Sequence, residues 1–531
     1  MLEPPGMEFD QPMSDSVFRS VPEQIRDRAR LHPLDVAIAC EGQSRTWGDF
    51  DRAIDAISHH LRSIGVRKGD RVALLAINSI EYAEAYFAAL RAGAVVVPLS
   101  TMVAGDALHR MLEDAAPKAL FVSSAFRTVI ESMRGGLPFC AERGLVAIDF
   151  VGPGWVPFME TSLTYYGAFH ERIEADDLYN IVYSSGTTGV PKGIVHTHQM
   201  RASFPGRFSV HGFSDDSVCL VATPLYGNFS LAAFLTTLVC GGTVVLLPKF
   251  DARGFLELAS QRRVTHTALV PIQFQRILDV DGFDSYDLGS FVAKFTGGAP
   301  TSVELKRAVA ARWPGRFIEL YGLTEGGPGA SLDVTAFPEK LHTVGRPGAD
   351  VRVIDEHGRE LPRGGVGEIV GRWPAMMATG YYKRPDLTEQ LIWRDGQGDV
   401  FHRSGDFGRL DEDGFIVLLD RKKDMIISGG LNVYAADIEA VMAGHPDVAE
   451  VAVVAMPSRE WGESPFAVVV PRAGTDLAGD ELMDWTNQRV GKGSRIAGVE
   501  LRSELPRNPL GKVLKRQLRD ELQHGRTSEV G

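Results

Sequence analysis

A loop rich in glycine and hydroxyl residues holds the side chains of this chain that are best suited to chemistry. Residues 183–193 read YSSGTTGVPKG and lie between two apolar runs. Glycines tolerate positive φ and let backbone N–H groups approach a ligand closely. Hydroxyls add neutral donors and Lys192 adds a positive charge; the hydroxyl residues are Ser184, Ser185, Thr187 and Thr188. These groups suit a polyphosphate, so the loop predicts a nucleotide site. The alternative is a plain hairpin turn, which needs neither the lysine nor the hydroxyls.

The loop differs from the common phosphate-binding loop. That motif places Lys and Ser/Thr directly after its second glycine, where a helix begins. Here Pro191 precedes Lys192 and Gly193 follows it. The flanking residues 181–183 and 194–195 are mostly β-branched. We therefore expect a loop between two strands.

Size and composition indicate a multidomain globular protein. The 531 residues exceed what one hydrophobic core usually serves. The net charge of −12 does not favour nucleic acid as a partner. The four cysteines have no metal or disulfide spacing, so we expect small buried side chains in a reducing compartment.

No targeting or membrane segment is expected. The N-terminal residues 1–16 lack the pattern of a signal peptide. The longest apolar run, residues 231–247, is broken by Gly241 and Gly242 and is too short for a membrane span. We interpret it as a buried helix followed by a strand, and expect a cytoplasmic protein.

Helical and strand patterns alternate along most of the chain. Residues 46–64 and 81–92 have helical spacing, and residues 70–75 and 94–99 read as buried strands. Such alternation predicts an α/β fold with mostly parallel sheets. Residues 367–414 suggest a small β-rich subdomain, and a charged junction follows at residues 420–424. We place a large domain at 1–420 and a small α+β domain at 421–531.

Four further segments could carry chemistry, although each alone also fits an ordinary structural role. They are the turn Gly298-Ala299-Pro300, the segment from Tyr321 and Gly322 to Thr324, Glu325 and Gly326, the carboxylate Asp406, and the lysine Lys512 before an apolar helical face. A strand-ending turn, a polar loop, a turn residue and a solvated lysine are the alternatives. The pair His196 and His198 has no third ligand nearby, so we favour ordinary packing or a polar contact over a metal site.

Taken in order, these segments resemble the adenylate-forming superfamily of acyl- and aryl-CoA synthetases, luciferases and peptide-synthetase adenylation domains. The resemblance covers nearly the whole chain. It includes residues 183–193, 297–300, 321–325, 367–368, 380–381, 404–406, 421–439 and 506–512.

The resemblance implies a two-step reaction. MgATP and a carboxylic acid give an acyl-adenylate and pyrophosphate, and a thiol then displaces AMP. Catalysis would depend on positioning and on neutralising crowded negative charge.

The resemblance also implies roles for the residues that stand at matching positions. Thr187, Thr188 and Lys192 would line the triphosphate site, and Gly298-Ala299-Pro300 with Tyr321 would border the adenine. Thr324 would contact the α-phosphate, Glu325 would bind Mg²⁺, and Asp406 and Arg421 would hold the ribose. Lys512 would bridge the carboxylate and the α-phosphate. Lys423 would be the hinge of a rotating C-terminal domain, and Gly430 would border the thiol tunnel.

Tyr226, Gly227, Gly298 and Gly326 would line the acyl pocket, and one departure from the family lies there. Gly227, next to Tyr226, stands where the family often has histidine. This suggests extra room or a different alignment of the acid.

The sequence therefore predicts an AMP-forming ligase of a carboxylic acid and coenzyme A. Transfer to a carrier protein or an amine is the alternative, and a non-catalytic nucleotide-binding or acyl-binding module is a more distant one. Lys192, Glu325, Asp406 and Lys512 together argue against a pure binder. The identity of the acid and the presence of a homodimer are left open.

Overall fold

Two compact units make up the chain. The computed structural model describes residues 18–103, 105–137, 140–141, 143–162, 166–184, 192–421, 424–428, 431–458, 461–491, 494–507 and 511–527. The first unit comprises Met1–Leu341, Gly348–Asp350 and Arg372–His402, and the second comprises His342–Pro347, Val351–Gly371 and Arg403–Gly531. The predicted α/β class with mostly parallel sheets is confirmed. The predicted domain boundary at residue 421 stays a prediction.

One sheet of the first unit runs in the order β19-β9-β8-β4-β3-β5-β6-β7. Its strands are β3 (Arg71–Leu75), β4 (Val95–Pro98), β5 (Ala119–Val122), β6 (Leu145–Ala147), β7 (Val156–Pro157), β8 (Leu178–Ser184), β9 (Lys192–Thr197) and β19 (Gly380–Tyr381). β3 to β8 pair in parallel, whereas β8 and β9 form an antiparallel pair. The predicted position of the glycine-rich loop between two strands is confirmed, although residues 185–191 lie outside the described residues.

The other sheet of this unit includes the order β15-β14-β13-β12-β10-β11-β1-β2. Its strands are β1 (Val36–Cys40), β2 (Gln43–Thr46), β10 (Val218–Val221), β11 (Thr243–Leu246), β12 (His266–Leu269), β13 (Ala293–Gly297), β14 (Arg316–Gly322) and β15 (Gly329–Asp333). β1 and β10 to β14 run parallel, and β2 and β15 are antiparallel to their neighbours. The carboxyl ends of β13 and β14 therefore lie at one edge.

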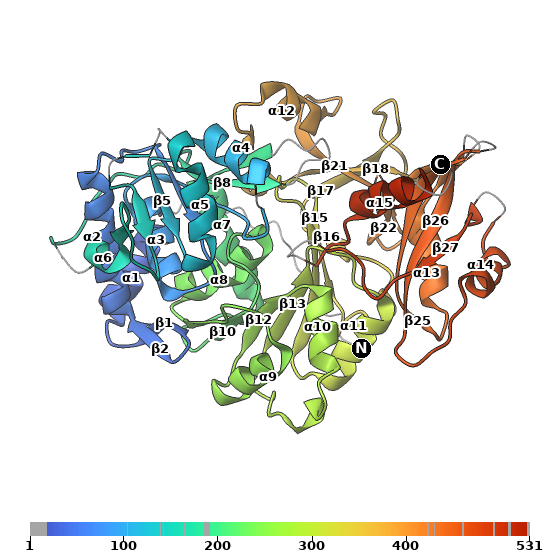
Figure 1. The fold of residues 1–531 in the computed structure, drawn as a ribbon, viewed down its shortest axis with the longest axis horizontal. Helices are drawn as coiled ribbons and strands as arrows, with labels where there is room; N and C mark the ends of the chain where they lie inside the picture. The colour runs from blue at the N-terminus through green and yellow to red at the C-terminus, as the bar shows by residue number, and fades with distance from the viewer. Residues whose placement is uncertain are drawn as a thin grey trace. The chain divides into compact units, whose positions relative to one another are not determined.

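The buried faces of four helices join the two sheets into one core, and Figure 1 shows these helices among the strands of the two sheets. They are α1 (Val21–Leu31), α2 (Trp47–Ser63), α3 (Ile80–Arg91) and α8 (Asn228–Cys240). Nearly every residue of α3 is buried, and so are most residues of α8, as expected for a helix that is apolar all round. α8 ends at Gly241, whose φ is +92°, and β11 follows. The predicted helix-then-strand interpretation of the long apolar run is thus confirmed.

Further helices cover this unit. They are α4 (Gly105–Ala115), α5 (Arg127–Met133), α6 (Phe158–Ser162), α7 (His198–Phe208), α9 (Ala252–Gln261), α10 (Pro271–Leu278), α11 (Val303–Arg312) and α12 (Pro385–Leu391).

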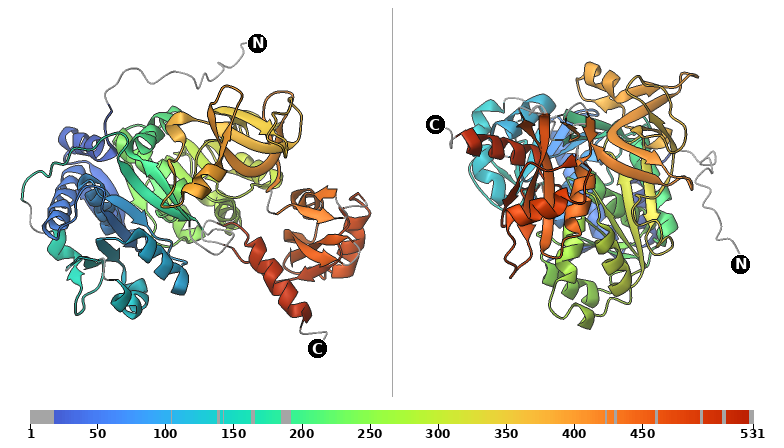
Figure 2. Two further views of the ribbon diagram at one scale, coloured as in Figure 1. Left: turned by 90° about the horizontal axis from the view of Figure 1, so that it is seen from above. Right: turned by 90° about the vertical axis from the view of Figure 1, so that its right-hand side faces the viewer.

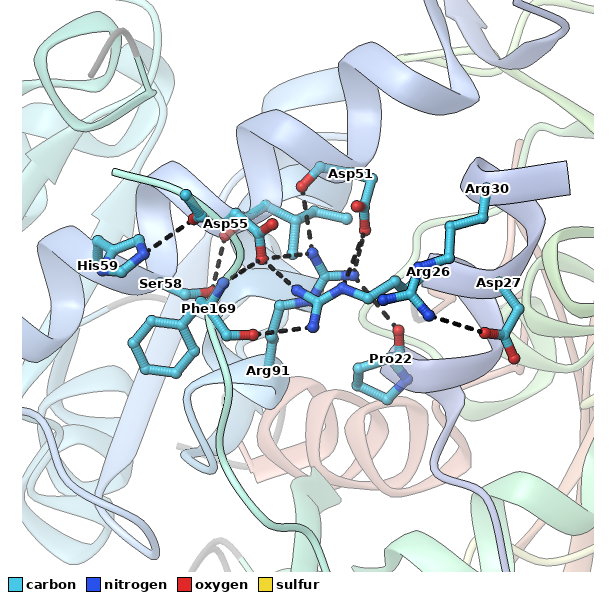
Figure 3. Close-up of polar contacts among 12 residues, drawn as sticks. Pro22, Arg26, Asp27, Arg30, Asp51, Asp55, Ser58, His59, Arg91 and Phe169 are labelled. Carbon is cyan, nitrogen blue, oxygen red and sulfur yellow. Dashed lines mark hydrogen bonds and ion pairs between the residues drawn. The ribbon is translucent and has the colours of Figure 1, made fainter. Parts of the chain in front are cut away.

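A buried polar network fastens α1, α2 and α3 to one another (Figure 3). The carboxylate of Asp55 on α2 accepts hydrogen bonds from Arg26 on α1 and, at 2.9 Å, from Arg91 on α3. It also accepts one from the backbone N–H of Phe169 at 3.1 Å. Asp51 lies one turn earlier and accepts from Arg91 at 2.6 Å. Because Asp55 is only 1% exposed, its charge depends on these partners.

The second unit contains a small β-rich part and a C-terminal α+β part. β17 (Asp350–Ile354), β18 (Gly367–Arg372), the end of β21 (Val400–Leu410) and β22 (Ile416–Arg421) build the first part, and β20 (Ile392–Arg394) pairs with the beginning of β21. This agrees with the predicted β-rich segment.

The C-terminal part has a sheet with helices on both faces (Figure 2). Its strands are β23 (Ile426–Ser428), β24 (Leu431–Val433), β25 (Val448–Ser458), β26 (Gly462–Pro471) and β27 (Val499–Leu501). Helices α13 (Ala435–Ala443) and α14 (Gly479–Asn487) pack on one face. Helix α15 (Lys515–Thr527) packs on the other through Leu518 and Leu522.

Among the helices that the structure describes, none combines the length and apolarity needed to cross a bilayer.

Candidate active site

Two turns that the sequence singled out lie side by side. Gly297 ends β13 and pairs with Leu320 of the parallel strand β14. The turn that starts at Gly298, with φ +79°, therefore stands next to the turn that follows Gly322. Carboxyl ends of parallel strands are the usual place for ligands in open α/β sheets. A Cβ at Gly297 would lie 2.8 Å from the carbonyl of Leu320, so glycine allows this close approach.

A carboxylate, a phenol and an ammonium meet at this edge. The Tyr381 hydroxyl donates to Oε1 of Glu325 at 2.8 Å. The Nζ of Lys192 lies 5.4 Å from the centre of the Tyr381 ring, within the range of a cation–π contact. Burial, and then the charge of Glu325, raise the pKa of Tyr381, so its hydroxyl stays protonated and can donate. Tyr381 thus links Lys192 to Glu325.

Backbone hydrogen bonds hold these residues in place. Ala378 N–H donates to the Glu325 carbonyl at 2.9 Å, and Tyr382 N–H donates to the Gly193 carbonyl at 2.7 Å. Tyr381 pairs with Ile194 of β9. Residues 378–382 thereby connect the turn after β14 to the beginning of β9, the strand on which Lys192 stands.

Gly326 is required by this connection. Its φ is +68°, and it forms an antiparallel bridge with Met377. A Cβ there would lie 1.7 Å from the Met376 carbonyl oxygen. Only glycine fits both the conformation and the space.

Two buried histidines form hydrogen bonds with the backbone of the turn that follows β14. His196 Nε2 lies 2.8 Å from the Thr324 carbonyl, and His402 Nδ1 lies 3.0 Å from the Glu325 carbonyl. Arg201 donates to His196 Nδ1 at 2.8 Å, so Nε2 is the protonated nitrogen that donates to Thr324. Burial, and then the charge of Arg201, lower the pKa of His196, which keeps the ring neutral. His196 therefore makes a specific polar contact with the backbone of Thr324.

The ribose candidates lie in the second unit. Asp406 and Arg421 are cross-strand partners in β21 and β22, and Arg421 Nε is 3.1 Å from Asp406 Oδ1. Asp406 is 5% exposed and sits within a strand. Lys512 also belongs to this unit, is half-buried and precedes α15.

Several predicted site residues lie outside the described residues: Ser185, Thr187, Thr188, Lys423 and Gly430. Ser184 ends β8 opposite Lys192. The described residues contain no cluster of three or more His, Cys, Asp or Glu that could hold a metal ion. A magnesium ion at Glu325 would therefore take its other oxygens from a nucleotide and water, as Mg²⁺ commonly does.

A cavity of about 160 Å³ adjoins the turn. Its lining is mostly apolar and aromatic: Met200, Phe204, Arg207, Phe208, His211, Asn228, residues 320–323, residues 326–331, Gly348, Trp373 and Met376. Of the predicted pocket residues, Gly326 lines it. Tyr226, Gly227 and Gly298 do not; Gly227 is the residue before α8, and Tyr226 is buried.

Sequence reasoning gave no role to Tyr381, His402, Arg207 or Trp373. Tyr381 could have been found, because residues 380–381 are among the segments that resemble the family. The other three had none, because they reach this edge from distant parts of the chain.

Comparisons with known proteins agree on one family. The model of the AMP-binding enzyme family matches residues 25–382, and that of the AMP-binding enzyme C-terminal domain matches residues 437–512. A feruloyl-CoA synthase from Amycolatopsis sp is 35% identical over 93% of this chain and 97% of its own length.

A fatty acid–[acyl-carrier-protein] ligase, ScoC, from Streptomyces coeruleorubidus is 31% identical over 93% of this chain and 94% of its own. Among solved structures, ATP-bound MatB from Rhodopseudomonas palustris is 29% identical, with a TM-score of 0.82, over 95% of this chain and 99% of that one.

Proposed function

The chain belongs to the AMP-binding enzyme family, and on that premise we propose that it is an AMP-forming ligase of a carboxylic acid and coenzyme A. The observation that carries the proposal is the linked group of Lys192, Tyr381 and Glu325 beside an apolar cavity. Cationic and metal-binding groups suit a polyphosphate, and an apolar cavity suits the body of an organic acid.

In the first step, an oxygen of the acid attacks the α-phosphorus of ATP. The bond to the pyrophosphate breaks, and an acyl-adenylate forms. Lys192 would stabilise the departing pyrophosphate, and Thr324 would donate to the α-phosphate. Glu325 would hold Mg²⁺, which neutralises phosphate charge when bound. The turn of Gly298, Ala299 and Pro300, with Tyr321 and Gly322, would border the adenine.

In the second step, the thiol sulfur attacks the acyl carbon and AMP leaves. Asp406 and Arg421 would hold the ribose throughout, and Lys512 would bridge carboxylate and α-phosphate during the first step. Thr187, Thr188, Ser184 and Ser185 would add donors to the phosphates. Lys423 as hinge and Gly430 beside the thiol remain part of the proposal on the sequence alone.

A carrier protein is the second candidate for the acceptor. The relative ScoC, at 31% identity, is named as a ligase of fatty acid and acyl-carrier protein. The name of the feruloyl-CoA synthase gives CoA as the acceptor, whereas the name of ScoC gives an acyl-carrier protein. The first step is the same for either acceptor.

A panel of carboxylic acids with MgATP tests both steps. AMP release is measured with CoA, with a phosphopantetheinylated carrier protein, and with neither. We expect acid-dependent AMP release that CoA accelerates, with an acyl-CoA product of matching mass. A thioester on the carrier protein alone would favour the second candidate, and ADP in place of AMP would contradict the proposal.

A further inference from the structure

One arginine lines the cavity without an acidic partner. Arg207 stands near the end of α7 and is the single charged residue among the described lining residues. No hydrogen bond or ion pair to a carboxylate reaches its guanidinium within the described part of the chain. Its contact is with the ring of Trp373, on which it stacks. Arg201, two turns earlier on the same helix, instead donates to Asn228 at 2.6 Å and to His196.

The surroundings of Arg207 are shaped to hold this stack. A Cβ at Gly348 would lie 2.8 Å from Trp373 and 3.4 Å from Arg207 Nη2. A Cβ at Gly329 would lie 3.3 Å from the same ring. The two glycines therefore leave room for the indole, and the indole fixes one face of the guanidinium.

Burial of the Arg207 guanidinium in a mostly apolar lining disfavours its charged form. Burial lowers the pKa of Arg207 to about 9. His211, which also lines the cavity, has its pKa lowered by burial to about 4 and is neutral at pH 7. A ligand oxygen that accepts from the guanidinium, either a carboxylate or a neutral hydroxyl, would supply the missing partner, because a charged donor makes a strong hydrogen bond to both.

We propose that Arg207 holds a second acidic oxygen of the substrate, so that the acid is a single-ring aromatic acid with a ring hydroxyl or a second carboxylate. This inference rests on the proposed function. The reacting carboxylate belongs near Thr324 and Glu325, on the turn after β14, whereas Arg207 lines the cavity from α7. The volume of about 160 Å³ fits one ring, since a cavity of about 150 Å³ holds benzene.

The test compares four acids that differ only at ring position 4: cinnamate, 4-methylcinnamate, 4-hydroxycinnamate and 4-carboxycinnamate. Acid-dependent ATP–pyrophosphate exchange is measured without CoA, so that only the first step contributes. In the wild type we expect kcat/KM for a hydroxyl or carboxyl acid to exceed that for 4-methylcinnamate at least tenfold. The two oxygen-bearing acids distinguish the hydroxyl from the carboxylate.

Variants assign the preference to Arg207. Arg207→Met keeps a long side chain that can pack on Trp373, and it should lower kcat/KM for the favoured acid on the order of 100-fold. Exchange with 4-methylcinnamate should stay within threefold, and Arg207→Lys should restore part of the preference. Arg253→Met, at an exposed position on α9, is the matched control.

Each other outcome overturns the inference. A wild-type preference for 4-methylcinnamate, or an equal loss of exchange for all acids in Arg207→Met, would each do so. If Arg207→Met does not fold, the wild-type preference and Arg207→Lys decide. Absence of exchange with every acid would instead count against the proposed function.

Discussion

The carboxyl group of Glu325 accepts a hydrogen bond from the hydroxyl of Tyr381. The protonated hydroxyl of Tyr381 lies 2.8 Å from its Oε1. A glutamine at this position could still accept that hydrogen bond through its amide oxygen. The substitution would therefore remove the negative charge and leave the local contact.

We expect Glu325→Gln to slow adenylate formation about 100-fold, because a group that neutralises charge in the transition state is lost. The measurement is kcat for acid-dependent pyrophosphate exchange at saturating MgATP. The melting temperature should stay within about 2 °C. Glu304→Gln, at an exposed position on α11, is the control. Exchange within threefold of the wild type would rule out a role for this charge.

The residues that carry the chemistry of the site could be predicted from the sequence. The residues that surround them and hold them in place could not. Lys192, Thr324 and Glu325 stand in segments whose glycines and hydroxyls are locally unusual, and Lys192 and Glu325 share a partner in Tyr381. His402 and Arg207 have ordinary neighbours in sequence. Their positions depend on long-range packing, which carries no local pattern.

At the scale of elements, a short segment couples two sheets. Residues 378–382 bond to the turn after β14 on one side and to β9 on the other. The turn belongs to one sheet of the first unit and β9 to the other. Any displacement of this segment would separate Glu325 from Lys192.

Gly326→Ala should displace this segment. A Cβ 1.7 Å from the Met376 oxygen cannot be accommodated, and alanine is strained at φ +68°. We expect pyrophosphate exchange to fall at least 100-fold, with a stability loss of about 2 kcal/mol. Gly396→Ala has open space around its Cβ and should change neither. An alanine variant with wild-type exchange would contradict the coupling.

The network around Asp55 gives a second prediction at this scale. Asp55→Asn leaves Arg26 and Arg91 buried with less negative charge (Figure 3). Losing one partner of a buried pair costs about 3 kcal/mol. We expect the first thermal transition to shift down by several degrees in calorimetry. Asp35→Asn, at an exposed position, should shift it by less than 1 °C. Equal shifts for both variants would show that the network does not stabilise the unit.

At the scale of the whole molecule, buried histidines make stability depend on pH. Burial lowers the pKa of His198, His211 and His266 to about 4. The unfolded chain binds these protons near pH 6.5, and the folded chain does not until about pH 4. Their contribution is complete above pH 6.5 and is lost as the pH falls toward 4.

Glu84 acts in the opposite direction. Burial raises its pKa to about 8, so its contribution is complete below pH 4.5 and is lost as the pH rises toward 8. Taken together, these four groups leave a net loss of about 2 kcal/mol between pH 6.5 and 5.5. Denaturant unfolding at the two pH values measures it. His198→Gln should reduce the difference by about 1 kcal/mol, and His357→Gln, at an exposed site, should not. A flat profile would contradict this account.

Much of the fold could be predicted because its signals are local. The helix-then-strand pattern of residues 231–247 became α8 and β11, and the strands around the glycine-rich loop became β8 and β9. The order of strands within each sheet could not be predicted, since residues far apart in sequence pair there. The division of the second unit among separated segments, such as Val351–Gly371 and Arg403–Gly531, has the same cause.

The formation of an acyl-adenylate is tested most directly by oxygen transfer. An accepted acid is labelled with ¹⁸O in its carboxylate, and the nucleotide product is analysed by mass spectrometry after turnover with MgATP and CoA. The mechanism predicts AMP carrying one ¹⁸O atom, because the carboxylate oxygen that attacks the α-phosphorus leaves with AMP. Unlabelled AMP, or ¹⁸O in inorganic phosphate with ADP as the nucleotide, would contradict it.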